Sequence, residues 1–455
     1  MVVSTEIAFL AVLAAVPWPI IMYILRSQNK RKLTEDELRQ NILHNGPLSP
    51  EGLENIAHHQ YKSAGWTKVD LALDKWWSFV AKHMPDSVAP NVVTLLGCAS
   101  VLVTTFLTFY FEPNPQAERP KWIGICAVIS MFLYQTFDAV DGKHARRTGQ
   151  SSPLGQLFDH GIDGFTLTIA TYNVAAGRGL TPLQFYIMFT VGHISYYCAQ
   201  WSERHTHVLA TNFGVLGVTE VQIISSLLGV TTYIIPYGQW SEPMSLVFPS
   251  VYKTIYSAVA AFVPTYVSSF VTFLFSFSLH HLIVGFVICS NVWIVYCQTK
   301  QVVTYYFGMT SRSETWRGLF RAAAELLPLV GFVIIHYLWK STPMVADHPI
   351  LYVITIAFLF SHLNNQVIVT GMAHDYFAWF QPVLIPFALV AVADRFYSDV
   401  ISEFNRALIA TALCMFVVFV QLRWAMRACQ QIATRLNIYV LKPGRPYTDE
   451  WKPLK

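Results

Sequence analysis

Apolar stretches close to the length of a membrane span recur along most of this chain, and they restrict its fold more than any other feature. In lipid, only α-helices and closed barrels satisfy every backbone hydrogen bond, and a spanning helix needs about 20 apolar residues. The candidate spans are residues 91–111, 121–141, 164–184, 185–201, 219–236, 276–299, 318–339, 349–370, 377–394 and 406–426. The sequence therefore predicts an all-α, polytopic transmembrane helix bundle with about ten core spans.

Composition agrees with this prediction. Charged residues make up 13% of the chain and hydrophobic residues 54%, whereas a soluble domain has about 25% charged residues. The net charge of +4 is small and is divided among short clusters beside the apolar stretches, so no nucleic-acid partner is predicted. The seven cysteines lack C-x-x-C spacing and mostly lie in apolar stretches, so they indicate core positions rather than zinc ligands or disulfides.

The N-terminal part divides into three segments. Residues 1–25 are a candidate membrane anchor, because their apolar run is followed by a basic cluster; two prolines leave a re-entrant or interfacial segment as the alternative. Residues 26–68 are polar and predict a cytosolic arm. Residues 69–84 carry apolar residues at helical spacing and two adjacent tryptophans, which favours an interfacial amphipathic helix over a soluble helix packed on the core.

Basic residues set the topology of the remainder. With ten spans in a membrane domain over residues 85–430, the clusters around Lys143 and Arg317 and the C-terminal tail 431–455 all face the cytosol. Residues 249–275 are also apolar. An extra span there would move Arg317 to the opposite side, so we expect this segment at the lumenal surface.

Four aspartates stand where the second and third spans meet. Asp138 and Asp141 are three residues apart, and Asp159 and Asp163 are four apart, so each pair projects from one helix face. A carboxylate at the bilayer centre costs about 2.5–3.5 kcal/mol even on the insertion scale, which requires a shallow or neutralised site. Four negative charges match two divalent cations with oxygen ligands. Two such ions can clamp the attacking and leaving oxygens of a displacement at phosphorus.

The loop between the aspartate pairs suits a phosphate substrate. Gly142 allows a close backbone approach, and Gly155 relieves crowding where the next helix passes. Lys143, Arg146 and Arg147 supply cations. Single aspartates at helix ends often cap helices or pair with arginine, but four of them around a basic loop favour a functional site.

These residues form a motif that resembles a known family. The CDP-alcohol phosphotransferases carry D-x2-D-G-x2-A-R-x8-G-x3-D-x3-D, and every fixed position has its match here. The matching residues are Asp138, Asp141, Gly142, Ala145, Arg146, Gly155, Asp159 and Asp163. The chain resembles the eukaryotic choline/ethanolamine phosphotransferase branch in particular, through "APNVVTLLG" at 89–97, "VTEVQ" at 218–222 and "CQQIATRLNIYVLKPG" at 429–444.

The resemblance runs from about residue 60 to the C-terminus, and it implies an activity. It implies transfer of phosphocholine or phosphoethanolamine from CDP-choline or CDP-ethanolamine to diacylglycerol, with release of CMP. It further implies two Mg2+ or Mn2+ ions held by the four aspartates, an endoplasmic-reticulum or related membrane with the active site facing the cytosol, and a homodimer. The residues implied to contact the CDP-alcohol are Asn91, Thr94, Gly142, Lys143, Ala145, Arg146 and Gly155.

The lipid hydroxyl needs a base, and His160 stands beside Asp159. A histidine titrates near neutrality and can accept that proton. Glu220 opens the fifth span on the same side and could orient the ring. The alternatives are Asp163 as the base, His160 as a helix-surface histidine, and Glu220 as a charge that complements a helix N-terminus.

Other interpretations compete with this one. Glu203, His205 and His207 in "WSERHTH" have zinc-like residue types without supporting spacing, and they indicate a solvated cytosolic loop. A CDP-diacylglycerol-dependent phospholipid synthase shares the aspartate motif but is shorter. A divalent-metal transporter would explain the aspartates but not the Gly/Arg loop, and the complete motif disfavours an inactive scaffold. Choline and ethanolamine both remain open as head groups.

Overall fold

The computed structural model describes residues 35–112, 114, 117–210, 217–262, 265–309 and 311–444. The candidate anchor at 1–25 and the end of the C-terminal tail lie outside the described residues. In chain order the elements are α3 (Glu35–His44), α4 (Pro50–His58), β1 (Ser63–Ala64), α5 (Lys68–His83), α6 (Pro90–Phe111), α7 (Lys121–Arg147), α8 (Pro153–Ala175), α9 (Pro182–Thr206), β2 (Leu209–Ala210), α10 (Val218–Ile234), η1 (Tyr237–Trp240), α11 (Met244–Val247), α12 (Pro249–Phe262), α13 (Thr265–Phe275), α14 (Leu279–Phe307), α15 (Arg312–Ala324), α16 (Leu327–Trp339), α17 (Pro343–Asp347), α18 (Pro349–Met372), α19 (Leu384–Phe396), η2 (Ser398–Val400) and α20 (Glu403–Leu436).

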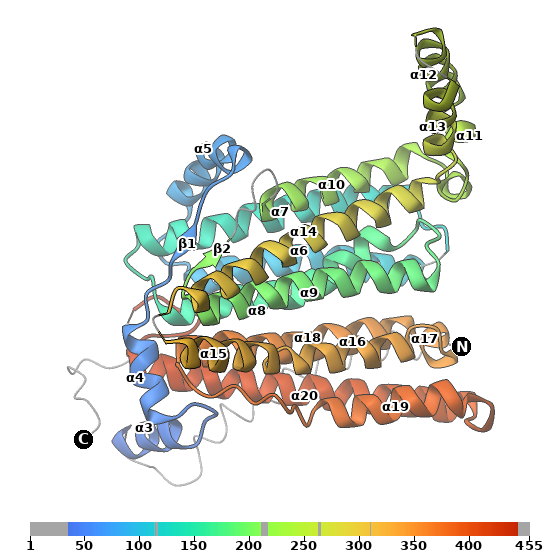
Figure 1. Ribbon diagram of the computed structural model, residues 1–455. Helices are drawn as coiled ribbons and strands as arrows, with labels where there is room; N and C mark the ends of the chain where they lie inside the picture. The colour runs from blue at the N-terminus through green and yellow to red at the C-terminus, as the bar shows by residue number, and fades with distance from the viewer. Residues whose placement is uncertain are drawn as a thin grey trace.

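The protein is a polytopic bundle of long helices (Figure 1), as the sequence predicts. Six helical stretches of the described residues are long and apolar enough to cross a membrane: α6, α7, α14, α15 with α16, α18 and α20. The other predicted spans correspond to α8 and α9, which carry more polar residues, and to α10 and α19, which are shorter. The two short strands pair in parallel, Ser63 with Leu209 and Ala64 with Ala210.

The predicted boundary between the third and fourth spans is wrong. The expected ranges 164–184 and 185–201 meet inside α9, whereas α8 begins at Pro153 and ends at Ala175. Gly177 and Gly179, with φ of +74° and +71°, lie in the turn between the two helices. Apolarity placed α8 too late, because the first half of this helix carries polar residues, and α8 packs against α6, α9 and α18.

The core of the bundle surrounds α18. Most side chains of this helix are buried, and it packs against α8, α9 and α20. Two glycines of α8 allow the close approach: a Cβ on Gly161 would lie 3.0 Å from Asn365 Oδ1, and one on Gly164 would lie 3.2 Å from Asn364 Nδ2. The helix that carries the second aspartate pair is therefore fixed to the centre of the bundle.

The described part of the predicted cytosolic arm is folded onto the bundle. Leu43, Leu48 and Leu53 are buried in a cluster shared with α18 and α20. The Gln431 side chain accepts a hydrogen bond from Leu48 N at 3.0 Å and donates one to Leu43 O at 2.8 Å. The helices α3 and α4 thus cover one end of α20 (Figure 1).

The predicted amphipathic helix at 69–84 is α5. One face packs on α7, where Trp77 is buried and Trp76 Nε1 donates to Thr136 Oγ1 at 3.2 Å. Leu71 and Phe79 on this helix are exposed. The helix therefore has an apolar face turned away from the protein, and its location in the membrane surface stays a prediction.

The apolar stretch expected at the lumenal surface forms α12 and α13. These two helices pack on each other and project sideways from the bundle, at the end opposite α3 and α4 (Figure 1). Val251, Phe270 and Phe273 on this pair are exposed. α12 and α13 run across the direction of the long helices instead of parallel to them (Figure 1). The lumenal location of this pair stays a prediction.

The stretch "WSERHTH" is not a solvated loop, as the sequence suggested, but the last two turns of α9. Arg204 and His205 are buried, and only His207 at the helix cap is exposed. Arg204 Nε lies 2.9 Å from Glu325 Oε2, and His205 Nε2 lies 3.0 Å from the same oxygen. The counter-ion comes from the end of α15, so local spacing could not indicate it.

Neutralising Glu325 tests this buried ion pair. Glu325→Gln leaves the Arg204 charge without its partner, and breaking a buried pair from one side costs roughly 3–5 kcal/mol. We expect the apparent melting temperature of the purified full-length protein to fall. The matched change Glu314→Gln, at an exposed position of α15, should leave it unchanged. Equal melting temperatures for the two variants would contradict a stabilising role.

Candidate active site

Carboxylates from both aspartate pairs converge between α7 and α8. Asp138 on α7 and Asp159 and Asp163 on α8 each place one carboxylate oxygen within 4.8 Å of the others. Tyr134 donates a hydrogen bond to Asp163 Oδ1 at 2.6 Å. Asp159 Oδ1 is buried without a hydrogen-bond partner among the described residues. Crowded carboxylates with an unpaired buried oxygen fit a hard divalent cation such as Mg2+ or Mn2+, which prefers oxygen ligands.

Asp141 lies beside this cluster instead of joining it. The residue is buried on α7, and its Oδ2 accepts a hydrogen bond from Thr94 Oγ1 at 2.5 Å. Thr94 belongs to the second turn of α6. An expected nucleotide contact and an expected metal ligand are therefore bound to each other. The structure brings three of the four expected ligands together and holds the fourth next to them.

Short-range signals in the sequence produce this convergence. α7 continues past its apolar part to Arg147, and Gly149 with φ of +68° lies in the turn that follows. α8 begins at Pro153, after Ser152, whose side chain accepts a hydrogen bond from Gly155 N. Because so few residues connect the two helices, the aspartates near their adjoining ends come to face one another.

Gly142 and Gly155 leave room beside the aspartates. A Cβ on Gly142 would lie 3.4 Å from a terminal nitrogen of Arg146, and one on Gly155 would lie 3.6 Å from Ser152 Oγ and 3.9 Å from Asn91 Oδ1. The distances at Gly155 are ordinary van der Waals contacts, so the packing of the helices does not by itself require a glycine there.

The cations at the end of α7 have different partners. Lys143 Nζ pairs with Asp74 at 2.5 Å, and Arg147 pairs with Asp86 at 2.6 Å, so both hold α5 and the loop after it. Arg146 is exposed. Within the described part of the chain, the Arg146 guanidinium has no hydrogen bond or ion pair, which leaves it available to a phosphate group.

The start of α6 meets the C-terminal tail at this site. Asn91 is buried, and its Nδ2 donates a hydrogen bond to Val440 O at 2.8 Å. Ala145 is also buried, and its carbonyl accepts from Gln150 N at 2.8 Å. Ala145 therefore packs the turn between α7 and α8, whereas Asn91 links two distant segments beside Gly155.

His160 is buried next to the carboxylates. Its Nε2 lies 4.0 Å from Asp159 Oδ2, and its Nδ1 has no hydrogen-bond partner among the described residues. The Tyr61 ring meets the imidazole edge-on, with 5.6 Å between centroids. Tyr196 donates a hydrogen bond to the His160 carbonyl at 2.8 Å. Tyr61 thus contacts the ring and Tyr196 holds the backbone of His160, while Nε2 of the ring lies toward a carboxylate.

Glu220 does not pair with His160 in this structure. Its Oε2 accepts a hydrogen bond from Gly217 N at 2.9 Å and so caps α10, and the ion pairs of the described residues include none between Glu220 and His160. Thr219 donates to Asp70 of α5 at 2.6 Å. The start of α10 therefore lies at the end of the bundle that carries α5 and the aspartates.

Sequence reasoning missed a polar chain next to the site. Gln156 on α8 donates to Glu203 Oε1 at 2.8 Å, and its Oε1 lies 2.9 Å from His59 Nε2. These three residues come from separate elements, and no local pattern connects them. Tyr134 was missed as well, although it stands one helical turn before Asp138, a spacing that places both side chains on one face.

Comparison with known proteins identifies relatives of the segment that contains the aspartates. A family model for CDP-alcohol phosphatidyltransferases matches residues 87–263, which contain all four aspartates. Cholinephosphotransferase 1 of Danio rerio is 26% identical over 397 residues, covering 87% of this chain and 95% of that protein. The Homo sapiens protein of the same name is 26% identical over 404 residues, covering 87% and 90%. The uncharacterized CDP-alcohol phosphatidyltransferase class-I family protein 3 of Dictyostelium discoideum is 28% identical over 383 residues, covering 82% and 90%.

Fold, site and comparisons define a class: a multi-pass membrane transferase of phospholipid head groups. Residues 87–263 match the family model for CDP-alcohol phosphatidyltransferases, and the resemblance seen in the sequence is confirmed. The substrates of this family are CDP-alcohols and diacylglycerol in a membrane, and its members generally use divalent metal ions. The carboxylate cluster of α7 and α8 has the donor atoms that such ions need.

Removing one carboxylate tests the metal site directly. Asp159→Asn takes away the buried oxygen that lacks a partner and one negative charge of the cluster, so we expect Mn2+ binding to weaken by at least about tenfold. Electron paramagnetic resonance titration of Mn2+ into the purified full-length protein measures this. Asp399→Asn, at an exposed position, is the matched control. Unchanged Mn2+ affinity in Asp159→Asn would remove this residue from the metal site.

Proposed function

We propose that this protein transfers phosphocholine or phosphoethanolamine from CDP-choline or CDP-ethanolamine to diacylglycerol, which yields phosphatidylcholine or phosphatidylethanolamine and CMP. One observation carries the proposal: three carboxylates from two helices meet within 4.8 Å, inside the segment that matches the family. Two of the relatives are named cholinephosphotransferase 1 and align over most of the chain, which favours this reaction over a CDP-diacylglycerol-dependent synthase or a metal transporter.

Asp138, Asp141, Asp159 and Asp163 would hold two Mg2+ or Mn2+ ions, which supply positive charge for the diphosphate and the departing CMP oxygen. For Asp141 to contribute, its carboxylate must exchange the hydrogen bond from Thr94 for a metal ion. That exchange would release the Thr94 hydroxyl beside the nucleotide. A single movement would then complete the ligand set and expose an expected substrate contact.

The other residues expected to contact the substrate differ in their hydrogen-bond and ion-pair partners within the protein. Arg146 would meet the diphosphate, since its guanidinium is exposed and unpaired within the described residues. Gly142 and Gly155 would let the nucleotide approach the backbone. Lys143 is already paired with Asp74, so we infer that it positions α5 over the site. Asn91 would seat the nucleotide together with the tail segment around Val440.

His160 is the proposed base for the diacylglycerol hydroxyl. Its burial and the distance of 4.0 Å to Asp159 support a position at the edge of the carboxylate cluster. Asp163 is the alternative base, although its oxygen belongs to the metal cluster and accepts a hydrogen bond from Tyr134. Glu220 would orient His160 only after it leaves the Gly217 amide, so its assignment depends on a movement at the start of α10.

We further propose that the protein acts in the endoplasmic reticulum or a related endomembrane, with the aspartates near the cytosolic face. The basic residues that follow the aspartates on α7 support this orientation. A water-soluble CDP-alcohol would reach the site from that face, and diacylglycerol would arrive from the bilayer. Neither the fold nor the comparisons support the homodimer that the resemblance implies, and we do not propose one.

An assay with both head groups tests the reaction. Full-length protein reconstituted with diacylglycerol should convert CDP-choline, CDP-ethanolamine or both to phospholipid and CMP, and EDTA should abolish the conversion while Mg2+ or Mn2+ restores it. Lipid product is measured by thin-layer chromatography of labelled substrate. Turnover of CDP-diacylglycerol with a soluble alcohol, and none with CDP-choline or CDP-ethanolamine, would contradict the proposal. It would identify the protein as a CDP-diacylglycerol-dependent phospholipid synthase.

Three substitutions identify the base. His160→Ala should lower kcat by roughly 10²- to 10⁴-fold, as expected for loss of a general base, with little change in Mn2+ affinity. Glu220→Gln should have a smaller effect, and the double variant should be little worse than His160→Ala alone, because residues that act as a unit are not additive. Near-normal turnover in His160→Ala, together with loss of turnover but not of metal in Asp163→Asn, would assign the base to Asp163.

A further inference from the structure

The imidazole of His160 has one ring nitrogen for which the described residues supply no partner. Nε2 lies 4.0 Å from Asp159 Oδ2, whereas Nδ1 is buried and makes no hydrogen bond with them. A neutral imidazole carries its hydrogen on one nitrogen and accepts on the other, and the hydrogen bond at one nitrogen decides which. If Nε2 is to accept a proton from a substrate, the hydrogen must stay on Nδ1, and Nδ1 needs an acceptor.

Helices α8 and α9 run in opposite directions, and their contacts show which residues face each other. A Cβ on Gly164 would lie 3.4 Å from the Tyr196 ring. Nearer the start of α8, Gln156 donates a hydrogen bond to Glu203 at 2.8 Å. His160 stands midway between Gly164 and Gln156 on α8. The position on α9 that faces it therefore lies between Tyr196 and Glu203.

Gln200 occupies this position on α9. It follows Tyr196 by one helical turn, so both side chains leave the same face of the helix, and Tyr196 donates a hydrogen bond to the His160 carbonyl at 2.8 Å. The Gln200 side chain interacts with the His160 ring. It is 3% exposed, and its Oε1 is buried without a hydrogen-bond partner among the described residues. An unpaired ring nitrogen and an unpaired amide oxygen thus belong to neighbouring side chains.

A glutamine suits this position because it is neutral. A carboxylate that oriented the ring would add a negative charge beside Asp159 and the rest of the carboxylate cluster, where like charges repel. The Gln200 amide supplies an acceptor oxygen without that charge. Glu220, the residue expected to orient His160, is instead bonded to Gly217 N. A purely structural role for Gln200, as a link between α8 and α9, does not account for its buried Oε1, which costs free energy while it stays unpaired.

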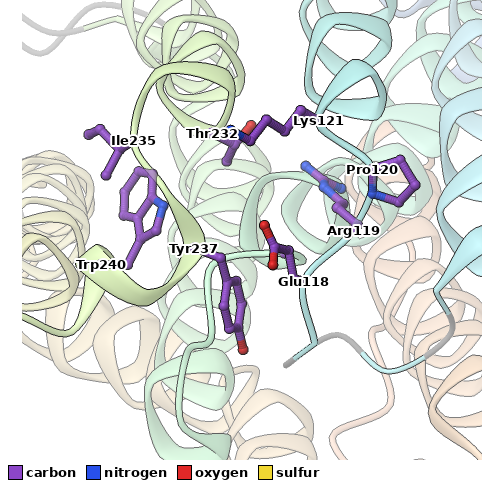
Figure 2. A pocket seen from close by; sticks show the side chains of 9 residues that line it. Glu118, Arg119, Pro120, Lys121, Thr232, Ile235, Tyr237 and Trp240 are labelled. Atoms are coloured by element: carbon purple, nitrogen blue, oxygen red, sulfur yellow. The ribbon is translucent and has the colours of Figure 1, made fainter.

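Not every buried polar atom without a partner needs one from the protein. Trp240 Nε1 is also unpaired among the described residues, but this residue lines a hollow beyond the end of α10, together with Lys121 and Thr232 (Figure 2). That hollow has room for about one water molecule, which can accept the Trp240 hydrogen. His160 and Gln200 differ from this case, since their unpaired nitrogen and oxygen come from two facing helices.

We propose that Gln200 is the positioning residue of the base: its Oε1 accepts a hydrogen bond from His160 Nδ1–H, which keeps Nε2 unprotonated and directed toward the carboxylates. A rotation of the amide forms this bond. The inference rests on the proposed function of His160 as the base. As the diacylglycerol oxygen bonds to phosphorus, its O–H hydrogen passes as a proton to Nε2, and CMP leaves with the electrons of the broken P–O bond. The hydrogen bond to Gln200 then holds the imidazolium in place.

Replacing Gln200 in the full-length protein tests this role. Gln200→Met keeps an unbranched side chain and removes the acceptor. With the CDP-alcohol that the wild type turns over, we expect kcat to fall roughly 10- to 100-fold, because a hydrogen bond to a charged group is lost. KM for the CDP-alcohol and Mn2+ affinity should change little. The matched control is Gln298→Met, at a glutamine that is also buried with an unpaired Oε1 and that contacts Ser195 of α9. It should keep the wild-type kcat.

A double-mutant cycle separates positioning from a structural effect. In the His160→Ala background, Gln200→Met should cause no further loss of kcat, because residues that act as a unit are not additive. If Gln200→Met does not fold, Gln200→Asn withdraws the amide by one methylene group and should give the same results. A loss that persists in His160→Ala, or near-normal kcat in the folded Gln200 variant while His160→Ala is impaired, would overturn the inference alone. Normal kcat in His160→Ala would contradict His160 as the base, and the positioning role with it.

Discussion

The mutual repulsion of Asp138, Asp159 and Asp163 is the constraint around which the rest of this molecule is arranged. Their oxygens lie within 4.8 Å of one another in a helical bundle of membrane-spanning length, where each negative charge is costly. Neighbouring helices hold them there: Tyr134 bonds one oxygen, and Gly161 and Gly164 bring α18 against the back of α8. Like charges held this closely repel one another, and a cation shared among them would relieve that repulsion.

Segments from distant parts of the chain close around this cluster. Tyr61 reaches His160 from the segment after α4, Asn91 holds the tail at Val440, and α3 and α4 are fixed to α20 through Gln431. The residues outside 87–263 thus complete the surroundings of a motif that lies inside that range.

Apolar stretches predicted the helices of this bundle well, since hydrocarbon demands them, and aspartate spacing predicted the cluster, since helical periodicity puts i and i+3 or i+4 on one face. Reasoning from apolar stretches failed where polar side chains pack against other helices of the protein. It placed the start of α8 too late, and it took Arg204 and His205 for a loop although Glu325 pairs with both. The bond between Asp141 and Thr94 and the contact of Gln156 with Glu203 join separate helices, and no single-helix pattern contains them.

The segment between α4 and α5 has a mechanical consequence. α4 is packed on α18 and α20, while α5 is packed on α7, and β1 between them pairs with β2 at the end of α9. Extended residues span only about 3.3–3.6 Å each. The segment between α4 and α5 therefore limits how far α4, with α18 and α20, can separate from α5, with α7. A two-chain lipid that reached the carboxylates would therefore have to pass at a place that this segment does not cross.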